Sequence, residues 1–134
     1  MPKNKILVIE DEKLIRWSLQ QELTKAGYEV FVAETGEQGL TLFRQNRDLD
    51  LVLLDIRLPG IDGIEVLRRI KAKAAGILVI IITAYLDPAT APPLIQLGAD
   101  EVLIKPFEME ELKQLVSKYL TTPHSQRIIS CAKT

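Results

Sequence analysis

Residues 51–60 read LVLLDIRLPG, and this stretch is the clearest structural signal in the chain. An apolar run, Leu51 to Leu54, leads directly into Asp55, and the turn signal Pro59-Gly60 follows closely. A short apolar run bounded by a turn is typical of a strand that is buried on both faces of a sheet. Such a strand would bring Asp55 to its C-terminal edge, where a carboxylate is costly unless other groups use it.

The bulk composition predicts one ordinary globular domain. The 134 residues suffice to bury a core, and 47% of them are hydrophobic while 26% are charged. The net charge of −1 offers no electrostatic footprint for nucleic acid or an acidic membrane. The single Cys131 fits a reducing cytosol, and the chain carries neither a membrane-spanning run nor a signal-peptide pattern. We therefore expect a cytoplasmic protein.

Short apolar runs alternate with helical patterns along the chain. The runs predict strands at residues 5–9, 28–32, 50–55, 77–82 and 100–104. The helical patterns cover residues 13–26, 35–46, 62–76, 87–98 and 108–120. Five buried strands joined by helical crossovers imply an α/β fold with a parallel sheet that is covered by helices on both faces.

Local signals mark the ends of several predicted helices. Gly27 follows the first helix as a C-terminal glycine would, and Gly76 ends the third. Thr35 stands three residues before Gln38, which is a capping-box arrangement, and Asp62 is placed to cap the third helix. In the fourth helix, Pro92-Pro93 forbids a regular helix through that point, so we expect a helix that starts late, with a proline in its first turn, or is short.

Residues that carry chemistry follow four of the predicted strands. They are Glu10 and Asp11 after the first strand, Asp55 in the third, Thr83 and Ala84 after the fourth, and Lys105 after the fifth. In an open α/β sheet the carboxyl ends of the strands line one crevice, so these residues are expected to face each other.

Three carboxylates at one place repel each other unless a cation lies among them, and hard oxygen ligands of this kind suit Mg²⁺. A hydroxyl and an ammonium at the same rim would complement a phosphoryl group, so the set could transfer one onto an aspartate. The alternative for Asp55 is a turn residue with only local hydrogen bonds. The acids at residues 10–12 could also favour a helix N-terminus, which we prefer for Glu12.

Four segments in this order resemble the receiver domains of two-component response regulators. They are ILVIEDE at 6–12, LLDIRLPGIDG at 53–63, ITA at 82–84 and KPF at 105–107. The resemblance runs from Lys5 to about Leu120 and implies a flavodoxin-like (βα)5 doubly wound sheet of five parallel strands in the order 2-1-3-4-5. The helix KLIRWSL at 13–19 is similar to receivers of the nitrogen-regulatory, sigma-54-activator kind.

The resemblance implies a role for each acid. Asp55 would accept the phosphoryl group from a phosphohistidine. Asp11 and Asp55 would ligate Mg²⁺ directly, together with the backbone carbonyl of Arg57, while Glu10 would act through water.

The family resemblance also implies which groups hold the phosphoryl oxygens. The Thr83 hydroxyl and the Ala84 backbone N–H would bind two of them, and Lys105 would pair with another. The peptide bond between Lys105 and Pro106 would be cis.

The implied function is a phosphoacceptor signalling domain with slow autodephosphorylation, not a turnover enzyme. Its partners would be a sensor histidine kinase or a histidine phosphotransfer protein, and an effector domain or downstream protein. We expect no direct contact with nucleic acid or membrane, and a monomer or a weak phosphorylation-dependent dimer. Residues 1–120 would form the receiver and residues 121–134 a polar tail or the start of a linker, so both a stand-alone receiver and one domain of a longer chain stay open.

Two features depart from the family pattern. Val102 stands where receivers usually carry Tyr or Phe three residues before the lysine, and Pro92-Pro93 falls in the fourth helix, which the family uses for output. We expect the chemistry at Asp55 to survive and signalling through this face to be altered or weak. The same features favour the alternative function, a pseudo-receiver or adaptor that binds partners without phosphorylation, whereas the intact acids and Lys105 oppose it.

Other interpretations are less well supported. A haloacid-dehalogenase-like phosphatase needs a second Asp two residues after its nucleophile, where this chain has Arg57. A flavin-binding protein wants a hydroxyl- and glycine-rich loop after the first strand, where this chain has three acids. Trp17 is expected to be a half-buried helix residue, with a kinase docking surface as the alternative. His124 is expected to be solvated and Cys131 inert.

Overall fold

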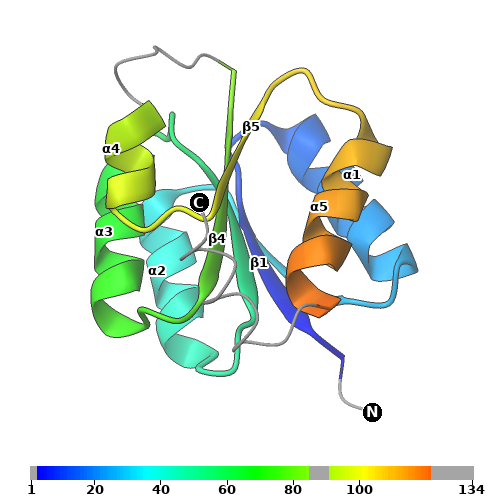
Figure 1. Ribbon diagram of the computed structural model, residues 1–134, viewed down its shortest axis with the longest axis horizontal. Helices are drawn as coiled ribbons and strands as arrows, with labels where there is room; N and C mark the ends of the chain where they lie inside the picture. Colours follow the sequence, from blue (N-terminus) through cyan, green and yellow to red (C-terminus); the bar gives the residue numbers. More distant parts are fainter. Residues whose placement is uncertain (1–2, 85–90, 122–134) are drawn as a thin grey trace.

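The computed structural model describes residues 3–84 and 91–121, which form three layers with a sheet between two sets of helices (Figure 1). The strands are β1 (Lys5–Ile9), β2 (Glu29–Ala33), β3 (Leu51–Asp55), β4 (Leu78–Thr83) and β5 (Glu101–Ile104). The helices are α1 (Lys13–Lys25), α2 (Gly36–Gln45), α3 (Gly63–Lys73), α4 (Ala91–Gln96) and α5 (Met109–Thr121).

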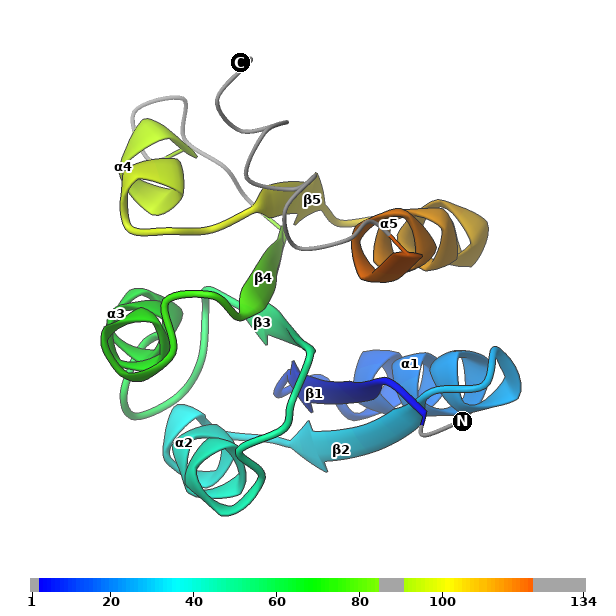
Figure 2. The same cartoon turned by 60° about the horizontal axis from the view of Figure 1, so that its bottom comes forward.

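The sheet has the strand order β2-β1-β3-β4-β5, with all neighbours parallel, which confirms the predicted topology (Figure 2). The register places Ile9 beside Leu54, so the next residues, Glu10 and Asp55, emerge at the same level. Asp55 itself lies beside Ile82 of β4. The crossover between β1 and β3 therefore brings two acids that are far apart in sequence to one edge of the sheet.

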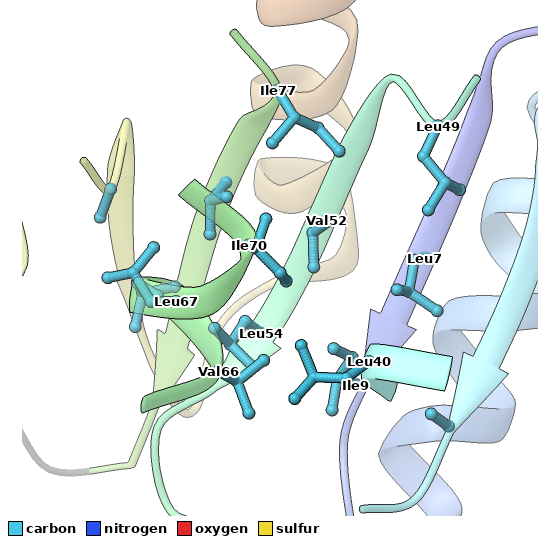
Figure 3. Packing of buried hydrophobic residues seen from close by; sticks show 14 of the residues in the cluster. Leu7, Ile9, Leu40, Leu49, Val52, Leu54, Val66, Leu67, Ile70 and Ile77 are labelled. Atoms are coloured by element: carbon cyan, nitrogen blue, oxygen red, sulfur yellow. The ribbon is translucent and has the colours of Figure 1, made fainter. Parts of the chain in front are cut away.

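Strand alternation divides the core into two halves. Leu7 and Ile9 point to the face that is covered by α2, α3 and α4 (Figure 3). Ile6 and Val8 belong to the other half of the core, under α1 and α5, and these two helices lie on the opposite side of the sheet (Figure 1). All five residues of β3 are buried, as expected for a central strand with helices on both sides. Asp55 is therefore held by a rigid element.

The predicted helix caps are present, with one difference in detail. Thr35 Oγ1 accepts a hydrogen bond from the Gln38 N–H at 3.1 Å, but the Gln38 side chain accepts from the N–H of Glu34, one residue earlier than in a capping box. Asp62 Oδ1 accepts from the Glu65 N–H at 3.0 Å. Gly27 follows α1 with a φ of 101°, which a residue with a side chain rarely adopts.

Some predicted boundaries are shifted by local bonds. β2 begins at Glu29 because the Tyr28 N–H bonds back to the Leu23 carbonyl at the end of α1. α3 ends at Lys73, earlier than Gly76. The described part of α4, Ala91–Gln96, contains both prolines near its first residue. The late start or shortness of this helix stays a prediction, because the residues before Ala91 lie outside the described part of the chain.

Parts of the predicted 87–98 segment and of the C-terminal tail, including His124 and Cys131, lie outside the described residues. Within the parts of the chain that the structure covers, no helix combines the length and apolar character needed to cross a membrane.

Gly63, the first residue of α3, lies against the end of β3, and Gly63→Ala is expected to destabilise the protein. A methyl group there would clash with the carbonyl oxygen of Asp55 and would lie 2.5 Å from Ile56 Cα. Because these are backbone atoms, the strand end or the helix must shift, which should lower the free energy of unfolding by about 1–3 kcal/mol. Urea denaturation measures this change, and a loss below about 0.5 kcal/mol would show that the contact relaxes freely.

Candidate functional site

Three carboxylates converge at the C-terminal edge of the sheet. Glu10 and Asp11 follow β1, and Asp55 ends β3; one carboxylate oxygen from each lies within 4.8 Å of the other two. Glu10 is buried completely and Asp55 almost so, whereas Asp11 is exposed. The structure thus brings the predicted acids together, and their oxygen atoms are ligands of the type that a hard divalent cation prefers.

Lys105 supplies the positive charge of this cluster. Its Nζ lies 2.9 Å from Asp55 Oδ2 in a hydrogen bond, and 2.7 Å from Glu10 Oε1 in an ion pair that lacks the alignment of a hydrogen bond. The Lys105 side chain is only 8% exposed. Glu12 also approaches it, at 3.3 Å. Glu12 is the N-cap residue of α1 and so lies at the helix N-terminus, as predicted. Its side chain makes no cap hydrogen bond and faces Lys105 instead.

The two buried acids are held in the same way. Asp55 Oδ1 accepts from the Arg57 N–H at 2.9 Å, and Glu10 Oε2 accepts from the Glu12 N–H at 3.1 Å. Each therefore has one oxygen near Lys105 and the other on a backbone N–H two residues further along the chain. In the described part of the chain the Asp11 carboxylate has no hydrogen-bond or ion-pair partner. Asp11 is thus the acid most open to a ligand.

Burial and ion pairing act in opposite directions on Glu10 and Lys105. It raises the pKa of Glu10 to about 7, against the opposing effects of Lys105 and the Glu12 N–H, and the nearby charge of Asp55 adds to the rise. Burial by itself would lower the pKa of Lys105, but the ion pairs with Glu10 and Asp55 outweigh it and raise that pKa above its usual range. Lys105 therefore stays charged, while Glu10 titrates near neutral pH.

Glu10→Gln is expected to make the metal-free protein more stable at about pH 8, with a gain that shrinks as the pH falls toward 5. The pKa of Glu10 rises from an ordinary 4.5 to about 7 in the folded protein, so folding takes up a proton between these values. The ionised side chain then opposes folding above pH 7, by at most about 3 kcal/mol. Thermal unfolding in EDTA across this pH range tests the prediction. A variant that is less stable at the alkaline end would show that the ion pair with Lys105 outweighs the cost of burial.

The remaining predicted residues lie at the same edge. Thr83 ends β4 and is 1% exposed, and its carbonyl accepts from the Lys105 N–H at 2.7 Å. Ala84 directly follows Thr83, and Arg57 stands two residues after Asp55. Both Ala84 and Arg57 are exposed. The Lys105–Pro106 peptide bond is cis, as the family resemblance implied.

Two residues of α1 were not described correctly from the sequence. Trp17 is 58% exposed, and so is more accessible than the half-buried residue that we expected, because it points away from the face of α1 that packs on the sheet. Sequence reasoning also missed Arg16, whose side chain donates to the carbonyls of Glu10 and Asp11. A cation near a helix N-terminus, against the helix dipole, is the signal that could have revealed it.

Comparisons with known proteins place this arrangement in a family. A family model for the response regulator receiver domain matches residues 6–117. The sporulation initiation phosphotransferase F of Bacillus subtilis is 42% identical over 120 residues, which cover 90% of this chain and 96% of that protein. The regulatory protein AtoC of Escherichia coli is 36% identical over 117 residues and 87% of this chain, but the match covers only 25% of AtoC.

Solved structures agree with the sequence matches. The response regulator protein TrrA from Thermotoga maritima, in complex with Mg(2+)-BeF, is 41% identical and has a TM-score of 0.77, with 87% of this chain and 98% of that chain covered. A CheY-like receiver domain protein from Methanospirillum hungatei has a TM-score of 0.85 at 27% identity, with 96% and 99% covered. The strand order, the acidic edge with its lysine and these matches together show that the chain belongs to the response regulator receiver domain family.

Proposed function

We propose that Asp55 is the phosphoacceptor through which this receiver domain carries out the signalling role of its family in a two-component system. The observation that carries the proposal is the position of the Asp55 carboxylate. It lies at the end of the central strand, in a hydrogen bond to Lys105 and beside two further acids. A rigid strand aims the carboxylate at the crevice, and the neighbouring groups can compensate the charge of an incoming phosphoryl group.

The chemistry is a phosphoryl transfer to a carboxylate oxygen. An oxygen of Asp55 attacks the phosphorus of a phosphohistidine; the new P–O bond forms an acyl phosphate as the P–N bond breaks, and the leaving imidazole takes up a proton. The ammonium of Lys105, which pairs with Asp55 and Glu10, is available for the added phosphoryl oxygens. Thr83 and Ala84 would bind two other oxygens through a hydroxyl and a backbone N–H.

The acidic cluster fits Mg²⁺. Asp11 and Asp55 would bind the ion directly, together with the Arg57 carbonyl, and Glu10 would act through water. The ion would supply positive charge that offsets the carboxylates and the phosphoryl oxygens. Two findings support this assignment: the three acids offer oxygens within 4.8 Å of one another, and the related TrrA was solved in complex with Mg(2+)-BeF.

The partners follow from the chemistry. The donor would be a sensor histidine kinase or a histidine phosphotransfer protein, and the output would be a change in contacts with an effector domain or a downstream protein. The domain would act in the cytoplasm as a switch that dephosphorylates slowly, without turnover of a separate substrate. The name of the B. subtilis relative, a phosphotransferase, supports a place in a phosphoryl-transfer chain.

Acetyl phosphate tests the proposal without a kinase. Incubation of the protein with acetyl phosphate and Mg²⁺ is expected to add one phosphoryl group, detected by intact mass, and peptide mapping should locate it on the peptide that contains Asp55. The same incubation in EDTA should give no adduct. A folded protein that stays unmodified with Mg²⁺ would contradict the proposal and favour the adaptor function that Val102 and the paired prolines suggest.

A further inference from the structure

Arg16, on the first turns of α1, holds the backbone of the loop that carries two of the acids. Its NH1 donates to the carbonyl oxygens of Glu10 at 2.9 Å and Asp11 at 3.2 Å. Its NH2 lies 3.4 Å from Glu34 Oε2, in the segment between β2 and α2. One guanidinium thus ties two successive carbonyls before α1 to a second loop, and the Arg16 side chain is only 15% exposed.

The position of Arg16 goes against the usual preference of a helix. The positive end of the helix dipole lies at its N-terminus, where a cation is unfavourable by about 0.3–1 kcal/mol. Glu12 at the N-cap offsets part of this cost, but the first turn of α1 itself contains no acidic residue. Helical side chains lean toward the N-terminus, however, so a long side chain at this position reaches back over the preceding loop. The bonds that Arg16 makes there are the compensation.

These bonds bear directly on the carboxylates. Glu10 is completely buried, so water does not readily replace Arg16 at its carbonyl. The Glu10 N–H already bonds to the Ala33 carbonyl at 3.0 Å, so Arg16 completes the backbone pairing of this residue. At Asp11, whose side chain has no partner in the described chain, the bond to the carbonyl is the contact that restrains the residue.

We infer that Arg16 is a positioning residue that holds Glu10 and Asp11 in the arrangement required for divalent cation binding, with Glu34 as its anchor. This inference rests on the proposed function, because it concerns the proposed metal-binding acids. Partners that orient metal ligands typically contribute about 10–100-fold to metal affinity.

Electrostatics and positioning predict opposite results for the same substitution. Arg16→Ala removes a positive charge near the cation site, so the charge effect alone would tighten Mg²⁺ binding. Loss of positioning would weaken it. Lys13 is the matched control, because it lies in the same turn of α1 and is exposed, and Lys13→Ala removes the same charge without touching the loop carbonyls.

The experiment is a titration of the full chain with MgCl₂ alone, followed through the amide resonances of Asp11, Glu12 and Asp55. Arg16→Ala is expected to weaken Mg²⁺ binding by about tenfold or more, whereas Lys13→Ala should leave it unchanged or slightly tighter. Arg16→Lys, which keeps the charge but not the planar fork, should stay well below the unsubstituted affinity. Glu34→Gln should produce a smaller loss.

The phosphorylation rate gives a second readout. Saturating Mg²⁺ should restore adduct formation by acetyl phosphate in Arg16→Ala, because a positioning defect acts on affinity. The amide spectra show whether each variant is folded, and Arg16→Lys and Glu34→Gln carry the test if Arg16→Ala is not. Equal or tighter Mg²⁺ binding in folded Arg16 variants would overturn the inference while leaving the proposed function intact. Failure of the unsubstituted protein to bind Mg²⁺ would overturn the proposed function itself.

Discussion

Asp55→Asn is expected to abolish phosphorylation by acetyl phosphate, with no adduct detected by intact mass under conditions that modify the unsubstituted protein fully. An amide has nearly the same shape as a carboxylate, but it is neutral and a poor nucleophile. It would also leave the phosphoryl group with no covalent attachment at the end of β3. Because shape is preserved and Glu10 still pairs with Lys105, the variant should stay folded.

Asp48→Asn provides the control for this experiment. The Asp48 side chain is 67% exposed and pairs with Lys5, away from the acidic cluster, so the variant should be phosphorylated as efficiently as the unsubstituted protein. Full phosphorylation of Asp55→Asn would assign the phosphoacceptor to another carboxylate, with exposed Asp11 the first to examine. Thermal unfolding of both variants checks that any loss is chemical rather than structural.

Lys105→Met is expected to destabilise the metal-free protein by about 3 kcal/mol or more at alkaline pH. The substitution keeps an apolar stem of similar length but leaves Glu10 and Asp55, whose side chains are 0% and 5% exposed, without their cation. Uncompensated buried charge is among the largest single causes of lost stability. The loss should be smaller at low pH, because protonation of Glu10 removes one of the two charges.

Mg²⁺ should rescue this variant. A cation bound among the acids takes over part of the compensation that Lys105 provided, so MgCl₂ should raise the stability of Lys105→Met more than that of the unsubstituted protein. Urea unfolding in MgCl₂ and in EDTA measures both effects. Lys113→Met is the control, because Lys113 pairs with Glu22 and Glu110 on a more exposed surface. This variant should lose much less stability than Lys105→Met and should respond to Mg²⁺ as the unsubstituted protein does. Equal Mg²⁺ responses in all three proteins would show that the cation does not replace the charge of Lys105, and the absence of any Mg²⁺ response would contradict a cation site at these acids.

The output surface is a separate question from the chemistry. Val102 is half-buried in β5 and packs against the half of the core that lies under α2, α3 and α4. Its side chain is smaller than the aromatic ring that receivers usually carry at this position. The described part of α4, Ala91–Gln96, contains Pro92 and Pro93 directly after its first residue. Altered or weak signalling through this face remains a prediction from the sequence.

The elements of the fold could be predicted because their signals are local. The apolar run before Asp55 and the capping residues Thr35 and Asp62 act on neighbours within a few positions, where periodicity and hydrogen-bonding capacity are visible directly. The convergence of Glu10, Asp55 and Lys105 also followed, because parallel strands place their carboxyl ends at one edge.

Other features depended on contacts between distant parts of the chain. Lys105 meets Asp55 across 50 positions and Glu12 across 93, and neither distance nor alignment can be read from the order of residues. The burial of Glu10, and with it a pKa near 7, is set by the elements that pack around it. The exposure of Trp17 likewise depends on which face of α1 meets the sheet.

The strands, the residues at their ends and the chemistry that those residues can perform were thus predictable from the amino-acid order, because backbone geometry and hydrophobic periodicity act locally. The sharing of one lysine by the acids, the depth at which each acid is buried and the contact of Arg16 with their loop became visible in the folded chain alone. These properties arise from desolvation and from hydrogen bonds whose donors and acceptors meet only when the chain has folded.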